Sequence, residues 1–128
     1  MGNGTPIGRV RGLGAARQGT HHWLLQRVTA AGNLLTVLFL AVSLVALPDL
    51  SYATVRAWLA QPLPALALAL LVVSVFWHAR LGLQVMIEDY VHEAGNKFAA
   101  LLALNLAVVG GIAFGLFCIV RLALGGAA

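Results

Sequence analysis

The chain has 128 residues, which is enough for one domain; 61% of them are hydrophobic and only 9% are charged. Soluble domains carry about 25% charged residues, so this composition, with a mean hydropathy of +0.92, excludes a soluble domain and indicates an integral membrane protein. The formal charge of +4 comes from eight scattered Lys and Arg residues, which form no basic patch with stacking aromatic residues, and we therefore expect no nucleic-acid partner. The single cysteine, Cys118, supports neither an intramolecular disulfide nor a cysteine metal cluster.

Residues 1–20 are predicted to be a basic tail at the membrane surface. They contain Arg9, Arg11 and Arg17, no acidic residue and no apolar core. A cleaved secretory signal needs such a core, so none is expected here. The remaining residues, 21–128, are predicted to form one all-α transmembrane anchor domain.

That domain is predicted to contain three transmembrane helices, at about 24–47, 63–88 and 98–124, because each stretch approaches the roughly 20 apolar residues that a bilayer requires. Thr20 is a candidate N-cap for the first helix. The connection 48–62 has room for a short interfacial turn of helix.

Prolines and glycines mark the second and third helices. Pro62 and Pro64 open the second, because proline is tolerated in a first helical turn. The third contains Gly110, Gly111 and Gly115, which predict close packing against a neighbouring helix, because small residues let two backbones approach in lipid.

The charged residues in the tail, in the turns and near the ends of the spans predict the orientation of the chain. Five basic residues fall on the side of the N-terminus and the second turn: Arg9, Arg11, Arg17, Arg27 and Lys97. Only Arg56 and Arg121 fall on the other side. The positive-inside rule then places the N-terminus inside, in the cytoplasm or matrix, and the C-terminus outside.

The polar residues of 76–92 are the main candidates for a functional site. On a helix, His78, Gly82, Val85 and Asp89 fall on one narrow face, with the carboxylate about 16 Å from the imidazole. A histidine within a lipid-buried helix needs a polar partner. It could be an axial ligand of a haem, whose second ligand would come from a partner subunit, or a packed histidine hydrogen-bonded to a neighbouring helix.

The arginine, tyrosine and aspartate residues near the inner side each have two interpretations. Arg27 and Arg80 lie towards the inner side and could pair with carboxylates such as haem propionates, or could snorkel to the interface, which is favoured for Arg80. Tyr90 could donate a hydrogen bond to a quinone carbonyl with Asp89 moving protons beside it, or could be an interface anchor next to a solvated acid.

Two motifs together carry a family resemblance. The first is Gly19-Thr20-His21 with Gln26-Arg27-Val28-Thr29-Ala30, and the second is His78-Ala79 with Gly82 and then Asp89-Tyr90. With these motifs the chain resembles the small hydrophobic membrane-anchor subunits, the D subunits, of succinate dehydrogenase (succinate:quinone oxidoreductase, respiratory complex II). The resemblance covers nearly the whole chain.

The resemblance implies that His78 is one axial ligand of haem b, its iron being the only metal expected, with the second ligand from the C subunit. It also implies that Tyr90 binds ubiquinone, with Asp89 beside it. Besides His78, the implied haem site contains three residues of this chain: His21, Arg27 and Gly82. No role is assigned to His22 or His92.

The implied partners are the cytochrome b anchor subunit (C), the iron–sulfur subunit (B), the flavoprotein subunit (A) and the lipid bilayer. Flavin and iron–sulfur clusters are expected only in those partners, because this chain has no Gly-rich dinucleotide motif and no cysteine cluster. The chain is thus expected to be a non-catalytic subunit in the bacterial inner membrane. The mitochondrial inner membrane is the less favoured location. The alternatives are a haem-free helical assembly protein, a fumarate reductase anchor and a proton- or ion-coupled transporter component.

Overall fold

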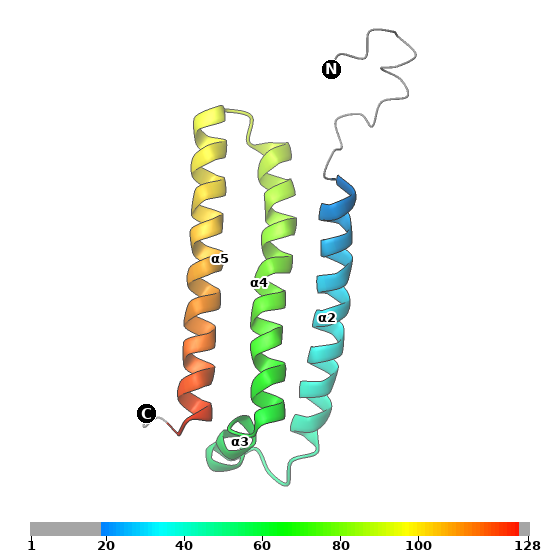
Figure 1. The fold of residues 1–128 in the computed structure, drawn as a ribbon, viewed down its shortest axis with the longest axis vertical. Helices are drawn as coiled ribbons and strands as arrows, with labels where there is room; N and C mark the ends of the chain where they lie inside the picture. The colour runs from blue at the N-terminus through cyan, green and yellow to red at the C-terminus, as the bar shows by residue number, and fades with distance from the viewer. Residues whose placement is uncertain (1–18, 126–128) are drawn as a thin grey trace.

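The structure, a computed structural model, describes residues 19–125, so the predicted basic tail lies almost wholly outside the described residues. All the regular elements of residues 19–125 are helices (Figure 1): α2 (Gly19–Val45), α3 (Tyr52–Leu59), α4 (Pro62–Tyr90) and α5 (Ala94–Ala123). The all-α fold predicted from the sequence is confirmed.

The three long helices are apolar and long enough to cross a membrane, as predicted. They contain 27, 29 and 30 residues, and at about 1.5 Å per residue each exceeds the ~30 Å hydrocarbon core of a bilayer. The first begins earlier than the predicted residue 24, because hydropathy marks the lipid-embedded part of a helix and not its polar end. The N-cap prediction for Thr20 is wrong, since Gly19 and Thr20 are themselves helical.

Helix α4 is the central element of the fold. It packs against α2 on one side and α5 on the other, so that the three helices form a row (Figure 1). Few side chains of residues 19–125 are buried: Pro64, Ala65, Ala67, Leu81, Val108 and Ile119. Most large apolar side chains in the described part are therefore left for lipid or for another protein.

Of the basic residues that predict the orientation, Arg9, Arg11 and Arg17 lie outside the described residues, whereas Lys97, Arg56 and Arg121 lie at the predicted ends of the row. Lys97, in the first turn of α5, lies at the same end as the start of α2, whereas Arg56 and Arg121 lie at the opposite end with α3 (Figure 1). The assignment of the first end to the inner side of the membrane stays a prediction.

The connection between α2 and α4 contains the short helix that the sequence left room for. The Ser51 hydroxyl caps α3 by accepting a hydrogen bond from the Thr54 N–H at 3.4 Å, and the Asp49 carboxylate accepts one from the Ser51 N–H at 2.9 Å. Hydrogen bonds from the side chain and backbone of Ser51 lower the pKa of Asp49. This carboxylate therefore supports the loop above its ordinary pKa, and the support is lost as the pH falls through the lowered value.

The glycines of α5 confirm close packing against α4 at two of the three predicted positions. A Cβ on Gly111 would overlap the Phe76 ring, and one on Gly115 would lie 2.8 Å from Val72 Cγ1. A Cβ on Gly110 would meet nothing within 4 Å, so close packing at Gly110 stays a prediction. Gly110 faces away from α4 because successive residues of a helix point about 100° apart.

This difference between neighbouring glycines gives a matched test of the helix row. We expect Gly111→Leu to destabilise the α4–α5 contact by about 1–3 kcal/mol, the usual cost of overpacking, and Gly110→Leu to leave that contact intact. Thermal unfolding of the purified membrane protein, with its natural partners bound, measures both variants. Equal losses of stability in the two variants would contradict the packing of α4 on α5 seen here.

Candidate functional site

His78 lies on α4 at its interface with α2, where it is half-buried. Its Nδ1 atom lies 3.0 Å from the Thr29 hydroxyl, and its Nε2 atom lies 3.3 Å from the amide nitrogen of Gln26. Both partners are on α2. Both ring nitrogens of the candidate ligand thus contact a single neighbouring helix of the same chain.

Further polar groups extend this cluster along α2. The Ser74 hydroxyl, one turn before His78, donates to the Thr29 carbonyl at 3.2 Å. On α2, the polar residues recur at steps of three and four, which places them on one face: His22, Gln26, Thr29, Asn33 and Thr36. We call this set the α2 polar stripe.

The α2 polar stripe was missed as a feature of the sequence, although its spacing is readable there. Three of its side-chain atoms are buried without a hydrogen-bond partner among the described residues: His22 Nε2, Gln26 Oε1 and Asn33 Oδ1. Buried polar atoms are normally satisfied. These three atoms of the stripe are therefore left unsatisfied by the described residues.

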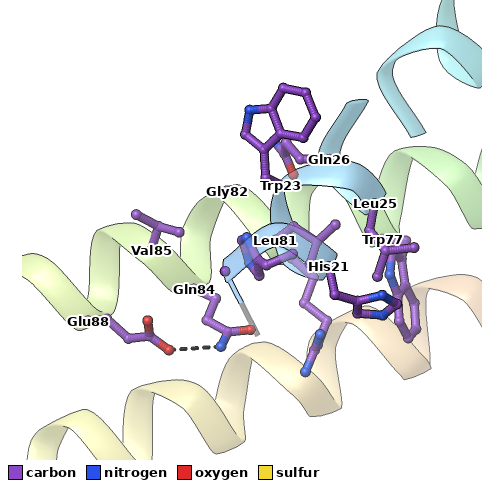
Figure 2. A pocket seen from close by; sticks show the side chains of 13 residues that line it. His21, Trp23, Leu25, Gln26, Trp77, Leu81, Gly82, Gln84, Val85 and Glu88 are labelled. Carbon is purple, nitrogen blue, oxygen red and sulfur yellow. Dashed lines mark hydrogen bonds between the residues drawn. The ribbon is translucent and has the colours of Figure 1, made fainter. Parts of the chain in front are cut away.

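A cavity of 930 Å³ opens between the beginning of α2 and the second half of α4 (Figure 2). Its size is within the range of small-molecule sites. The α2 side of the lining includes His21, His22 and Gln26, and the α4 side includes Trp77, Arg80, Gly82, Gln84, Val85 and Glu88. In Figure 2 the Gln84 amide donates to the Glu88 carboxylate, at 2.8 Å.

Arg80 lines the cavity and forms a hydrogen bond with a residue of α5. Its Nε donates to the Asn105 Oδ1 at 2.6 Å, and its guanidinium lies 5.3 Å from the centroid of the Trp77 ring. Arg80 is ten residues before the end of α4 and Asn105 eleven residues after the start of α5, so the two lie at similar depth. The side chain is thus bonded to α5 through its Nε, and the expectation that Arg80 snorkels to the interface stays a prediction.

The structure brings some of the predicted haem residues together and separates another. His21 lines the cavity, and Gly82 lies beside Gln26, since a Cβ there would be 3.8 Å from the Gln26 amide nitrogen. Arg27 instead lies exposed on another face of α2, with its guanidinium 5.4 Å from the Trp23 ring centroid. Its predicted role beside the haem stays a prediction.

The predicted quinone residues lie at the end of α4, outside the lining of the cavity. Asp89 and Tyr90 are both exposed, Tyr90 to 79%. Of the predicted face, Gly82 and Val85 line the cavity, while His78 is linked to the lining residue Gln26 and Asp89 lies apart. The carboxylate at the cavity is that of Glu88, which the sequence analysis had not singled out.

Within residues 19–125, no group of three or more His, Cys, Asp or Glu side chains could hold a metal ion. The site consists instead of one half-buried imidazole, a polar stripe with unpaired atoms and a cavity open to the outside of the chain. These features define a small helical membrane protein with a partly unsatisfied polar site between α2 and α4.

The chain belongs to the succinate dehydrogenase/fumarate reductase transmembrane subunit family, whose sequence profile matches residues 1–112. It is 34% identical to the succinate dehydrogenase hydrophobic membrane anchor subunit of Paracoccus denitrificans over 122 residues, which cover 94% of this chain and 93% of that protein. The protein of the same name from Rickettsia bellii is 38% identical over 86 residues, covering 66% and 68% of the two chains. No solved structure matches the chain significantly. The resemblance predicted from the two sequence motifs is confirmed.

Proposed function

We propose that this chain is the hydrophobic membrane anchor subunit of a succinate:ubiquinone oxidoreductase in a bacterial inner membrane. Relatives of that name match it over most of their length and come from bacteria. Its partners would be a cytochrome b anchor subunit, an iron–sulfur subunit and a flavoprotein subunit. The exposed apolar side chains of the helix row leave ample surface for a second anchor subunit and for lipid.

The observation that carries the proposal is the position of His78 in the α2–α4 interface. Its Nε2 contacts the amide nitrogen of Gln26 at 3.3 Å, beyond the usual 2.7–3.2 Å of an N–H bond, so the contact is one that a stronger partner can replace. The other nitrogen is held by Thr29, and no carboxylate competes for the ring among the hydrogen bonds of the described residues. This donor set fits an axial ligand of haem b, with the second ligand supplied by the partner anchor subunit.

When bound, a haem would supply one-electron chemistry; this chain would hold and orient one axial nitrogen. Gly82 lies one turn after His78, and a Cβ there would be 3.8 Å from the Gln26 amide nitrogen that contacts His78 Nε2. Beyond the haem, Tyr90 would donate a hydrogen bond from its hydroxyl to a ubiquinone carbonyl, and Asp89 would accept or return protons at the membrane surface. His21 and Arg27 would supply positive or hydrogen-bonding groups to the propionates at the same end of α2.

A fumarate reductase anchor is the second candidate, because the family profile covers both enzymes. The two would differ in the quinone used and in the physiological direction of electron flow. Activity of the purified complex with ubiquinone against a low-potential menaquinone analogue separates them.

Co-purification tests the anchor function itself. A tag on the C-terminus, followed by gentle solubilisation, is expected to recover bound flavin, iron–sulfur clusters and succinate:ubiquinone reductase activity together with this chain. Recovery of the chain without flavin or iron would overturn the proposal and favour a haem-free assembly protein.

A further inference from the structure

The Thr29 hydroxyl has one proton and three neighbours that could take it. Its oxygen lies 2.8 Å from the Leu25 carbonyl, 3.2 Å from the Gln26 carbonyl and 3.0 Å from His78 Nδ1. A carbonyl oxygen can only accept, and 2.8 Å is the optimal O–H···O distance. If the hydroxyl proton pointed to Nδ1 instead, two oxygen lone pairs would face one another at that distance. The proton therefore goes to the Leu25 carbonyl.

The imidazole proton follows from this assignment. With the hydroxyl proton on Leu25, Thr29 Oγ1 is an acceptor, and the contact at 3.0 Å must be a hydrogen bond that His78 Nδ1–H donates. Nε2 then has a free lone pair, which accepts from the Gln26 amide at 3.3 Å. In this assignment the imidazole is the Nδ1–H tautomer, the one that leaves Nε2 free to bind a metal.

Thr29 is itself held in place. Its own carbonyl accepts a hydrogen bond from the Ser74 hydroxyl at 3.2 Å, one turn before His78 on α4. Its β-branched side chain has few rotamers in a helix, and back-bonding to Leu25 fixes the one observed. Two hydrogen bonds thus join the same turns of α2 and α4: one between the Thr29 hydroxyl and the His78 ring, and one between the Thr29 carbonyl and the Ser74 hydroxyl.

From this geometry we propose that Thr29 is a positioning residue for His78: its hydroxyl oxygen accepts the Nδ1 proton, fixes the tautomer and the plane of the ring, and strengthens Nε2 as an axial haem ligand. The inference rests on the proposed function, because the metal concerned is the haem iron. A hydrogen bond from the distal nitrogen increases electron donation by the ligating one and favours ferric iron.

Two substitutions separate the hydroxyl from the shape of the side chain. Thr29→Val keeps the branched shape and removes the acceptor, whereas Thr29→Ser keeps the hydroxyl. In the whole purified complex, we expect Thr29→Val to weaken haem retention by about 10–100-fold, the usual effect of losing such a partner, and to raise the haem midpoint potential. We expect Thr29→Ser to keep both values close to those of the wild type.

Thr36→Val provides the matched structural control. Thr36 is also on α2 and its hydroxyl also donates to a backbone carbonyl one turn earlier, that of Gly32 at 2.7 Å, but the hydrogen bonds of His78 go to Thr29 and Gln26, so the haem potential is expected to stay unchanged. The inference is overturned if Thr29→Val has the wild-type potential and haem content, or if Thr29→Val and Thr29→Ser lose haem equally. A wild-type b-type spectrum in His78→Ala would instead overturn the haem ligand of the proposed function, so the two failures are distinguishable.

Discussion

His78→Ala is expected to abolish the b-type haem signal in the reduced-minus-oxidised spectrum of the purified complex, while the flavin and iron–sulfur content persists. The imidazole is the half-buried group at the α2–α4 interface, and its removal takes away the proposed axial nitrogen. The change also leaves the Thr29 hydroxyl and the Gln26 amide without their partner on α4. Leaving such groups unsatisfied costs about 1–3 kcal/mol, so the complex should also unfold at a lower temperature.

His92→Ala is the control for this experiment. His92 is exposed in the turn between α4 and α5, and its replacement should leave the spectrum unchanged. A b-type signal of normal size and shape in His78→Ala would show that the ligand comes from elsewhere. A lost signal in both variants would point to a general failure of assembly and would contradict a ligand role specific to His78.

The three long helices could be predicted from the sequence because apolar runs of membrane length have few other structures available. The same method placed the helix ends less well. Gly19 to Trp23 continue α2 beyond its apolar part, and Asp89 and Tyr90 still belong to α4. Helical hydrogen bonds continue into water, whereas the hydropathy signal ends at the lipid boundary.

The candidate site could be predicted only in part, because the pattern of one helix does not say which neighbour covers it. The spacing from His78 correctly placed Gly82 and Val85 along one face of α4. It could not show that α2 packs there, and so Gln26 and Thr29 were read only as parts of a motif. The hydrogen bond from Arg80 to Asn105 could not be predicted for the same reason, since Asn105 is on α5.

Tyr90→Phe is expected to slow ubiquinone reduction by the assembled complex by at least about tenfold, which corresponds to about 1.4 kcal/mol. The change removes only the hydroxyl, and a single neutral hydrogen bond contributes about 0.5–1.5 kcal/mol, or more where charge develops on the acceptor. Tyr90 is 79% exposed at the last residue of α4, about 18 Å along the helix from His78. The haem spectrum should therefore stay unchanged.

Tyr52→Phe is the matched control, because the chain has two tyrosines and Tyr52 is 69% exposed at the opposite end of the helix row. Succinate oxidation with a soluble dye as acceptor should be normal in both variants, since the dye bypasses the quinone. A loss confined to the quinone assay of Tyr90→Phe would place the quinone near the membrane surface at which α2 begins and α4 ends. Equal quinone kinetics in Tyr90→Phe and the wild type would leave Tyr90 as an interface anchor, and the quinone donor would then have to come from a partner subunit.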